Sequence, residues 1–152
     1  MISQTAPLIM GCDHAAVELK TTIKTFLAEQ GIAVTDVGTH GPDSVDYPDF
    51  GHEVAGRVAS GEFQRGILIC GTGLGMSMTA NRHRGVRAAL CNGLFSATMS
   101  RQHNDANLLV LGGRVIGDVL ALEIVRTWLT TDFEGGRHQQ RIDKLDKIGE
   151  SC

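Results

Sequence analysis

The sequence predicts an α/β protein in which a parallel five-stranded sheet carries helices on both faces. Short apolar or β-branched runs alternate with longer segments of helical periodicity, and glycine or polar residues bound each run. Parallel strands need a crossover connection, which the intervening helices supply. The expected strands are residues 8–12, 33–37, 66–70, 86–91 and 108–111. The expected helices are residues 15–30, 48–60, 75–81, 95–103 and 117–131, followed by a polar C-terminal helix from about 137 to 149.

Length and composition limit the class of protein. A chain of 152 residues suits one packed core, so a single domain over residues 1–152 is expected. A net charge of -3 lacks the basic character typical of nucleic-acid binding. No segment approaches the roughly 20 apolar residues that cross a bilayer, and the N-terminus has no basic region before its short apolar run. We therefore expect a soluble cytoplasmic protein with neither nucleic-acid nor membrane partners.

The cysteines and histidines show no spacing typical of a disulfide framework or a metal site. Cys12, Cys70, Cys91 and Cys152 have no short paired spacing, which favours free thiols in a reducing compartment. No H-E-x-x-H motif or closely spaced Cys/His set occurs, so no metal is expected.

Polar and glycine residues follow the predicted strands. Ligands of open parallel sheets bind outside the carboxyl ends of the strands, so these residues should gather at one edge. Any one of them alone is as well explained as an ordinary polar loop residue, and the expectation rests on the set. The set comprises Asp13, His14, Asp46, Tyr47, residues 70–75, Asn92, Gly113 and Arg114.

The stretch ICGTGLGMSMTAN places a glycine loop between a strand and a helix. It fails the dinucleotide fingerprint because Met76 occupies the third glycine position and the next strand ends in Cys91 and Asn92 instead of an acid. It also lacks the Gly-Lys-Ser/Thr triplet of a P-loop. What remains is a run of backbone N–H groups at a helix N-terminus, suited to an anion or a developing oxyanion. Beside this run, Cys70 is either a small buried hydrophobe or a base or nucleophile.

Five successive motifs then add a resemblance. GCDHA, DYPDF, GILICGTGLGMSMTANR, SRQHNDANLLVLGGRVIG and EGGRHQQRI resemble those of the ribose-5-phosphate isomerase B family, which includes galactose-6-phosphate and allose-6-phosphate isomerases. The resemblance covers nearly the whole chain. It implies a Rossmann-like three-layer αβα sandwich, a homodimer or a tetramer of paired dimers, no cofactor, and aldose–ketose isomerisation through a cis-enediol. The family's base is a cysteine at the position of Cys70 or a glutamate at that of Gly75, and this chain carries the cysteine.

The resemblance assigns roles residue by residue. Cys70 is the base, His103 protonates the ring oxygen of the sugar, and Asp13 assists at the anomeric hydroxyl. A helix N-terminus favours the thiolate form, so the loop can serve both the base and the oxyanion. Thr72 either helps the base and binds a hydroxyl or is a plain turn residue. The expected substrate-binding residues are Asp13, His14, Tyr47, Gly71, Thr72, Gly73, Leu74, Gly75, Asn104, Arg114, Arg137 and Arg141, of which His14 and the three arginines hold the phosphate.

Without the resemblance, several of these residues have plainer explanations. His103 could cap the C-terminus of its helix, where cations are favoured. Arg137 and Arg141, four residues apart, share one helix face and could be two solvated surface charges.

The resemblance favours ribose 5-phosphate and ribulose 5-phosphate, an interconversion of the pentose phosphate pathway. A four-carbon or six-carbon sugar phosphate is an alternative, and a non-catalytic module that binds a phosphorylated ligand is a third. The thiol beside an oxyanion loop distinguishes the enzymes from the module, which has no use for it.

The predicted topology also separates the site residues. His103, Arg137 and Arg141 should lie near the amino edge of the sheet, opposite the loop that holds Cys70. Strands about 17–20 Å long keep the two groups beyond hydrogen-bond reach, so a two-fold dimer with shared sites is expected.

Overall fold

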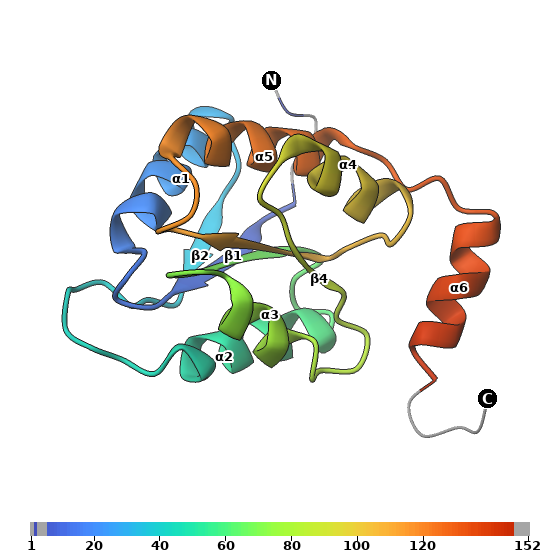
Figure 1. Ribbon diagram of the computed structural model, residues 1–152, viewed down its shortest axis with the longest axis horizontal. Coiled ribbons are helices and arrows are strands. Elements are labelled where there is room, and N and C mark those ends of the chain that lie inside the picture. Colours follow the sequence, from blue (N-terminus) through green and yellow to red (C-terminus); the bar gives the residue numbers. More distant parts are fainter. Residues whose placement is uncertain (1, 3–5, 148–152) are drawn as a thin grey trace.

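The computed structural model describes residue 2 and residues 6–147, and it contains the predicted five-stranded parallel sheet (Figure 1). The strand order is β2-β1-β3-β5-β4. Because the order reverses between β1 and β3, the loops that follow these two strands flank the position where parallel sheets bind ligands. The strands are β1 (Leu8–Cys12), β2 (Val34–Asp36), β3 (Gly66–Cys70), β4 (Ala88–Leu90) and β5 (Leu108–Gly112).

Helices cover both faces of the sheet and form the predicted three-layer sandwich (Figure 1). One layer holds α1 (Val17–Glu29), α4 (Leu94–Gln102) and α5 (Asp118–Thr130). The other holds α2 (Tyr47–Ala59) and α3 (Leu74–Ala80). β1, β3 and β5 are buried along their whole length, which explains why they appear in the sequence as continuous apolar runs. None of the helices in the described part of the chain has both the length and the hydropathy of a membrane-spanning segment.

The last helix, α6 (Arg137–Leu145), stands outside the three layers (Figure 1). Gly135 and Gly136, both at positive φ, turn the chain into it. Its buried side chains are His138 and Ile142. The helix ends at Leu145 with Asp146 as its C-cap, so the predicted end near residue 149 is too late. Cys152 lies outside the described residues.

The predicted starts of α1 and β4 are each two residues too early, and side-chain hydrogen bonds explain both. The helix predicted from residue 15 begins at Val17, because the Asp13 carboxylate accepts the N–H of Ala15 (3.0 Å) and holds a turn there. The strand predicted over residues 86–91 is confined to β4, where the Arg87 N–H donates to the side-chain carbonyl of Asn107 (2.8 Å).

A buried ion pair fastens α1 to β2. Lys20 donates to the Asp36 carboxylate (2.7 Å) and to the Thr39 carbonyl (2.6 Å), and Lys24 donates to the other Asp36 oxygen (2.7 Å). The Lys20 side chain is only 2% exposed, whereas that of Lys24 is 40% exposed. Burial alone would raise the pKa of Asp36, but hydrogen bonds from Lys20, Lys24 and the Gly38 N–H outweigh it and lower that pKa.

We expect Lys20→Met to lower the free energy of unfolding by about 3 kcal/mol at pH 7, because a buried carboxylate loses its buried partner. The matched variant Lys24→Met, at the exposed partner, should cost no more than about 1 kcal/mol. Since the folded pKa of Asp36 is lowered, the stabilisation is present above the ordinary carboxyl pKa and is lost as the pH falls through the folded value. Urea denaturation at pH 7 and pH 3 measures both effects; equal losses for the two variants at pH 7 would contradict the assignment.

Candidate active site

The glycine loop lies between β3 and α3. Gly73 is the N-cap of α3 at φ +81°, and a Cβ there would collide with the Leu90 side chain, so only glycine fits. The first N–H groups of a helix have no acceptor within that helix. The loop therefore offers donors at the carboxyl edge of the sheet.

Cys70 ends β3 immediately before this loop. Its side chain is 4% exposed and packs with the apolar residues beneath α2 and α3. The Gly73 N–H donates to the Cys70 sulfur at 3.1 Å. An N–H group of the loop is therefore directed at the Cys70 side chain.

Residues that follow β1 and β5 lie against the same loop. The N–H groups of Gly113 and Arg114 donate to the carbonyls of Cys70 (2.8 Å) and Gly71 (2.9 Å). The Arg114 side chain passes over the α-carbon of Gly71, and Asp13 is buried at the end of β1. The fold thus brings these predicted residues together around the switch point.

An open cavity of about 510 Å³ adjoins this group. His14 lines it, and its Nδ1 accepts the Val45 N–H (3.2 Å), which leaves Nε2 to donate to an anion. Arg114 lines the same cavity. Glu18, His40 and Asp118 also line it, and the sequence reasoning did not include them. They come from three separate segments, so only the tertiary fold reveals them.

Tyr47 closes the other side of the glycine loop. Its ring lies over Gly75 so closely that a Cβ at residue 75 would come within 2.5 Å of it. A glutamate at this position would require the tyrosine to move, so the pocket is shaped around glycine. Thr72 is exposed, and its hydroxyl accepts the Leu74 N–H (3.3 Å), which is the turn contact that the plainer explanation expects.

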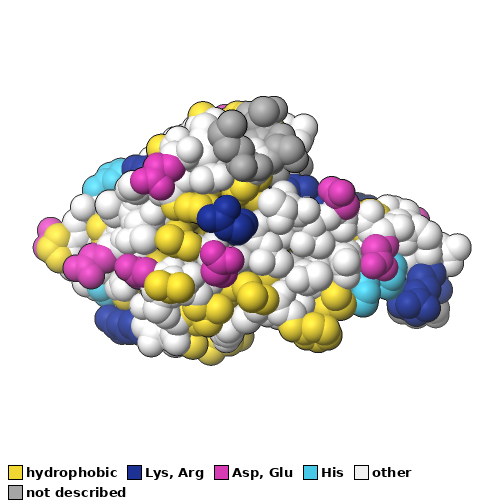
Figure 2. Space-filling view, turned by 90° about the horizontal axis from the view of Figure 1, so that it is seen from above, with side chains coloured by type: hydrophobic (Ala, Val, Ile, Leu, Met, Phe, Trp, Pro, Cys, Tyr) yellow, Lys and Arg dark blue, Asp and Glu magenta, His cyan; other side chains and the backbone are white. Residues whose placement is uncertain are grey.

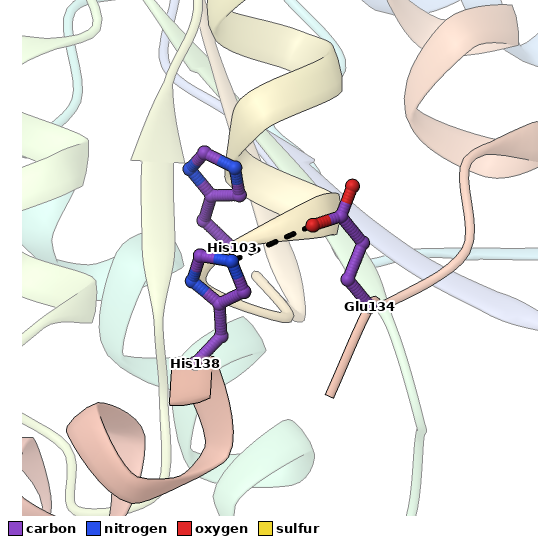
Figure 3. A group of neighbouring side chains, drawn as sticks. All are labelled: His103, Glu134 and His138. Atoms are coloured by element: carbon purple, nitrogen blue, oxygen red, sulfur yellow. Dashed lines mark ion pairs between the residues drawn. The ribbon is translucent and has the colours of Figure 1, made fainter. Parts of the chain in front are cut away.

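A second group of predicted residues lies where α4 ends. His103 is the C-cap of α4, and its ring stacks on that of His138 with centroids 4.2 Å apart and planes 9° apart (Figure 3). The Glu134 carboxylate lies 3.5 Å from Nε2 of His138 (Figure 3). Arg137, Arg141 and Asn104 are exposed nearby in the chain. His138 and Glu134 were not predicted from the sequence, although their spacing of four residues is a signal that places them on one side of the chain near α6.

The two groups occupy opposite edges of the sheet. Gly66 and Leu108 are paired at the start of β3 and β5, whereas Cys70 and Gly112 are paired at the end. At about 3.3 Å per residue, the ends of β3 are separated by roughly 13 Å. Because His103 precedes β5 and Cys70 is the last residue of β3, the two residues lie toward opposite ends of the strands within one chain.

The sequence contains no closely spaced set of metal ligands, but the fold assembles one candidate set. His103, Glu134 and His138 offer ligand atoms within 4.8 Å of one another, and imidazole with carboxylate suits Zn²⁺. A ring nitrogen binds a metal in the plane of its ring, and two nearly parallel rings 4.2 Å apart cannot share an ion in both planes. One imidazole would have to leave the stack, so the arrangement does not fit a shared metal ion.

Comparisons with known proteins extend this picture. The sequence family described as Ribose/Galactose Isomerase matches residues 8–145. Ribose-5-phosphate isomerase B of Escherichia coli strain K12 is 48% identical over 141 residues, which are 93% of this chain and 95% of that protein. D-erythrulose-4-phosphate isomerase of Pectobacterium atrosepticum is 42% identical over 140 residues, 91% of each chain.

Solved structures agree with the sequence comparison. The structure of Clostridium thermocellum ribose-5-phosphate isomerase B superposes with a TM-score of 0.92 at 55% identity, covering 93% of this chain and 96% of that one. The match spans the sheet, its helices and α6, which together carry both groups of site residues. This chain therefore belongs to the ribose/galactose isomerase family and is a sugar-phosphate isomerase of the aldose–ketose type.

Proposed function

We propose that the enzyme interconverts ribose 5-phosphate and ribulose 5-phosphate, with Cys70 as base and His103 as the acid that opens the sugar ring. The observation that carries this proposal is the Cys70 sulfur held 3.1 Å from the Gly73 N–H at the start of a donor-rich loop. An isomerase needs a base beside the carbon that loses its proton and donors beside the oxygen that gains charge. This loop offers both.

The chemistry proceeds through a cis-enediol(ate). The Cys70 thiolate takes the C2 proton of the open-chain aldose, and the electron pair of that bond forms the C1–C2 double bond while charge moves onto O1. The O2 hydroxyl then passes its proton to O1, and the thiol returns its proton to C1 as the C2 carbonyl forms. Backbone N–H groups of residues 71–75 stabilise the charged oxygen in this scheme, apart from those of Gly73 and Leu74, which donate to the Cys70 sulfur and the Thr72 hydroxyl.

The phosphate is assigned to the cationic residues. Arg114 and His14 line the cavity beside the glycine loop. Arg137 and Arg141 lie on the exposed side of α6, and planar guanidinium groups suit phosphate oxygens. Asp13, Tyr47 and Asn104 are proposed to contact the sugar, and Thr72 to bind a hydroxyl or support the base.

We further propose a homodimer that shares its two active sites. Large apolar side chains are exposed where α3, α4 and α5 begin, at the carboxyl edge of the sheet. Two of them, Phe95 and Val119, are each 80% exposed. Figure 2, which views the face carrying α1, α4 and α5, shows hydrophobic side chains in a band that reaches the edge of the molecule. Such a surface fits burial against a second subunit. The exposed set is Leu74, Met78, Leu94, Phe95, Val115, Val119 and Leu120.

Each dimer site would combine one chain's glycine loop with the other chain's His103 and α6 arginines. We place the enzyme in the cytoplasm, since Cys12, Cys70 and Cys91 are all buried free thiols.

A four-carbon sugar phosphate is the second candidate substrate, favoured by the identity to D-erythrulose-4-phosphate isomerase. An aldose of four carbons with phosphate on O4 has no hydroxyl that can close a furanose ring. It therefore needs no ring-opening acid, whereas ribose 5-phosphate closes its ring through O4. Loss of activity when His103 is replaced would therefore favour the five-carbon substrate. Measuring kcat/KM for ribose 5-phosphate and for the four-carbon aldose phosphate shows which of the two the enzyme prefers.

The experiment that tests the proposal separates ring opening from proton transfer. His103→Ala should convert ribose 5-phosphate about 10²-fold more slowly, the ordinary contribution of a general acid. Ribulose 5-phosphate is acyclic, so exchange of its C1 hydrogen with D₂O needs only Cys70 and the loop. NMR should show this exchange within about threefold of wild type. If His103→Ala converts ribose 5-phosphate at the wild-type rate, or loses both reactions equally, the assignment of His103 is wrong.

A further inference from the structure

His138 is the nearest ring neighbour of His103, and the two side chains differ in exposure. The His138 side chain is 6% exposed and lies in the first turn of α6, whereas His103 is partly exposed. The rings are stacked with centroids 4.2 Å apart and planes 9° apart. A sugar can therefore reach the first ring, while the second supports it from behind.

The backbone holds this stack in place. The Glu134 N–H donates to the carbonyl of Gln102, the residue before His103, at 3.1 Å. That bond ties the segment leading into α6 to the end of α4. The Glu134 carboxylate also faces Nε2 of His138 across 3.5 Å (Figure 3). The end of α4, which carries His103, and the start of α6, which carries His138, are thereby held together.

Charge in the stack is distributed unequally. Burial lowers the pKa of His138, and His103, Arg137 and Arg141 lower it further against the opposing effect of Glu134. Every group that faces His138 except Glu134 therefore disfavours a positive charge on its ring.

We infer that His138 is a positioning residue for ring opening: its buried ring, stacked on that of His103, fixes the plane of the His103 imidazole. This inference rests on the proposed role of His103. A general acid must hold its N–H in line with the ring oxygen, and small misplacements lower the rate steeply.

His138→Ala tests the inference because it removes the supporting ring. We expect kcat for ribose 5-phosphate to fall about tenfold or more, with KM changed less than about threefold. Exchange of the C1 hydrogen of ribulose 5-phosphate with D₂O should stay within about threefold of wild type, since that reaction does not use His103. His138→Phe keeps a flat buried ring and should restore kcat to within about threefold of wild type.

A matched control comes from another histidine pair. His83 lies 2.8 Å from His52, nitrogen to nitrogen, on the part of the chain around α2 and α3. His83→Ala should leave both reactions unchanged. Thermal melts of all variants check folding.

Three results would overturn the inference: wild-type kcat in His138→Ala, loss of conversion and exchange together with a raised KM, or a His138→Phe enzyme as slow as His138→Ala. The combined loss would mean that His138 merely seats α6 and its phosphate-binding arginines. If His103→Ala itself converts ribose 5-phosphate normally, the proposed function fails. If His103→Ala is slow but His138→Ala is not, only the positioning role fails.

Discussion

Cys70→Ala is expected to lower kcat for ribose 5-phosphate by about 10³-fold or more while leaving substrate affinity nearly unchanged. In the proposed mechanism the thiol acts only in the proton-transfer step, and alanine offers no group to replace it. Binding depends on other groups, namely the cationic residues assigned to the phosphate and the N–H groups of the loop. A coupled assay measures kcat, and calorimetric titration with ribose 5-phosphate measures binding.

Cys91→Ala is the matched control for this variant. Cys91 is also a buried free thiol at the carboxyl end of the sheet, but it packs on the side of α4 and α5, away from the glycine loop. Its loss should change kcat less than about twofold, apart from a small effect on stability. Turnover like that of the wild type in Cys70→Ala would remove the thiol from the mechanism.

The sequence predicted the sheet well because its strands are buried on both faces. β1, β3 and β5 appear as unbroken apolar runs bounded by glycine and polar residues, which is a local signal. The edge strand β4 was predicted too long. The Arg87 N–H donates to the side chain of Asn107, which lies 20 residues further along the chain, and so Arg87 is not part of the strand. No local pattern reports that bond.

The candidate site divides in the same way. The group around Cys70 was predictable because a strand, a glycine loop and a helix follow one another directly, and because parallel strands end at one edge. The stacking of His138 on His103 was not predictable, since it depends on how α6 docks against the end of α4. Likewise, Glu18 and Asp118 meet at the cavity only through the packing of α1 beside α5.

In the proposed homodimer, each active site is built from two chains. Within one chain, His103 lies at the amino edge and Cys70 at the carboxyl edge, roughly 13 Å of β3 apart. In a mixed dimer of Cys70→Ala and His103→Ala chains, one site receives both lesions. The other receives the intact Cys70 of one chain and the intact His103 of its partner, so it is complete.

Mixing the two inactive variants under conditions of subunit exchange measures this directly. With equal amounts, half of the dimers are mixed and half of their sites are intact, so activity toward ribose 5-phosphate should return to about a quarter of wild type. Chains of different tagged mass establish that mixed dimers have formed. If mixed dimers are present and activity stays at the level of the separate variants, each chain carries its own complete site and the shared-site account is wrong.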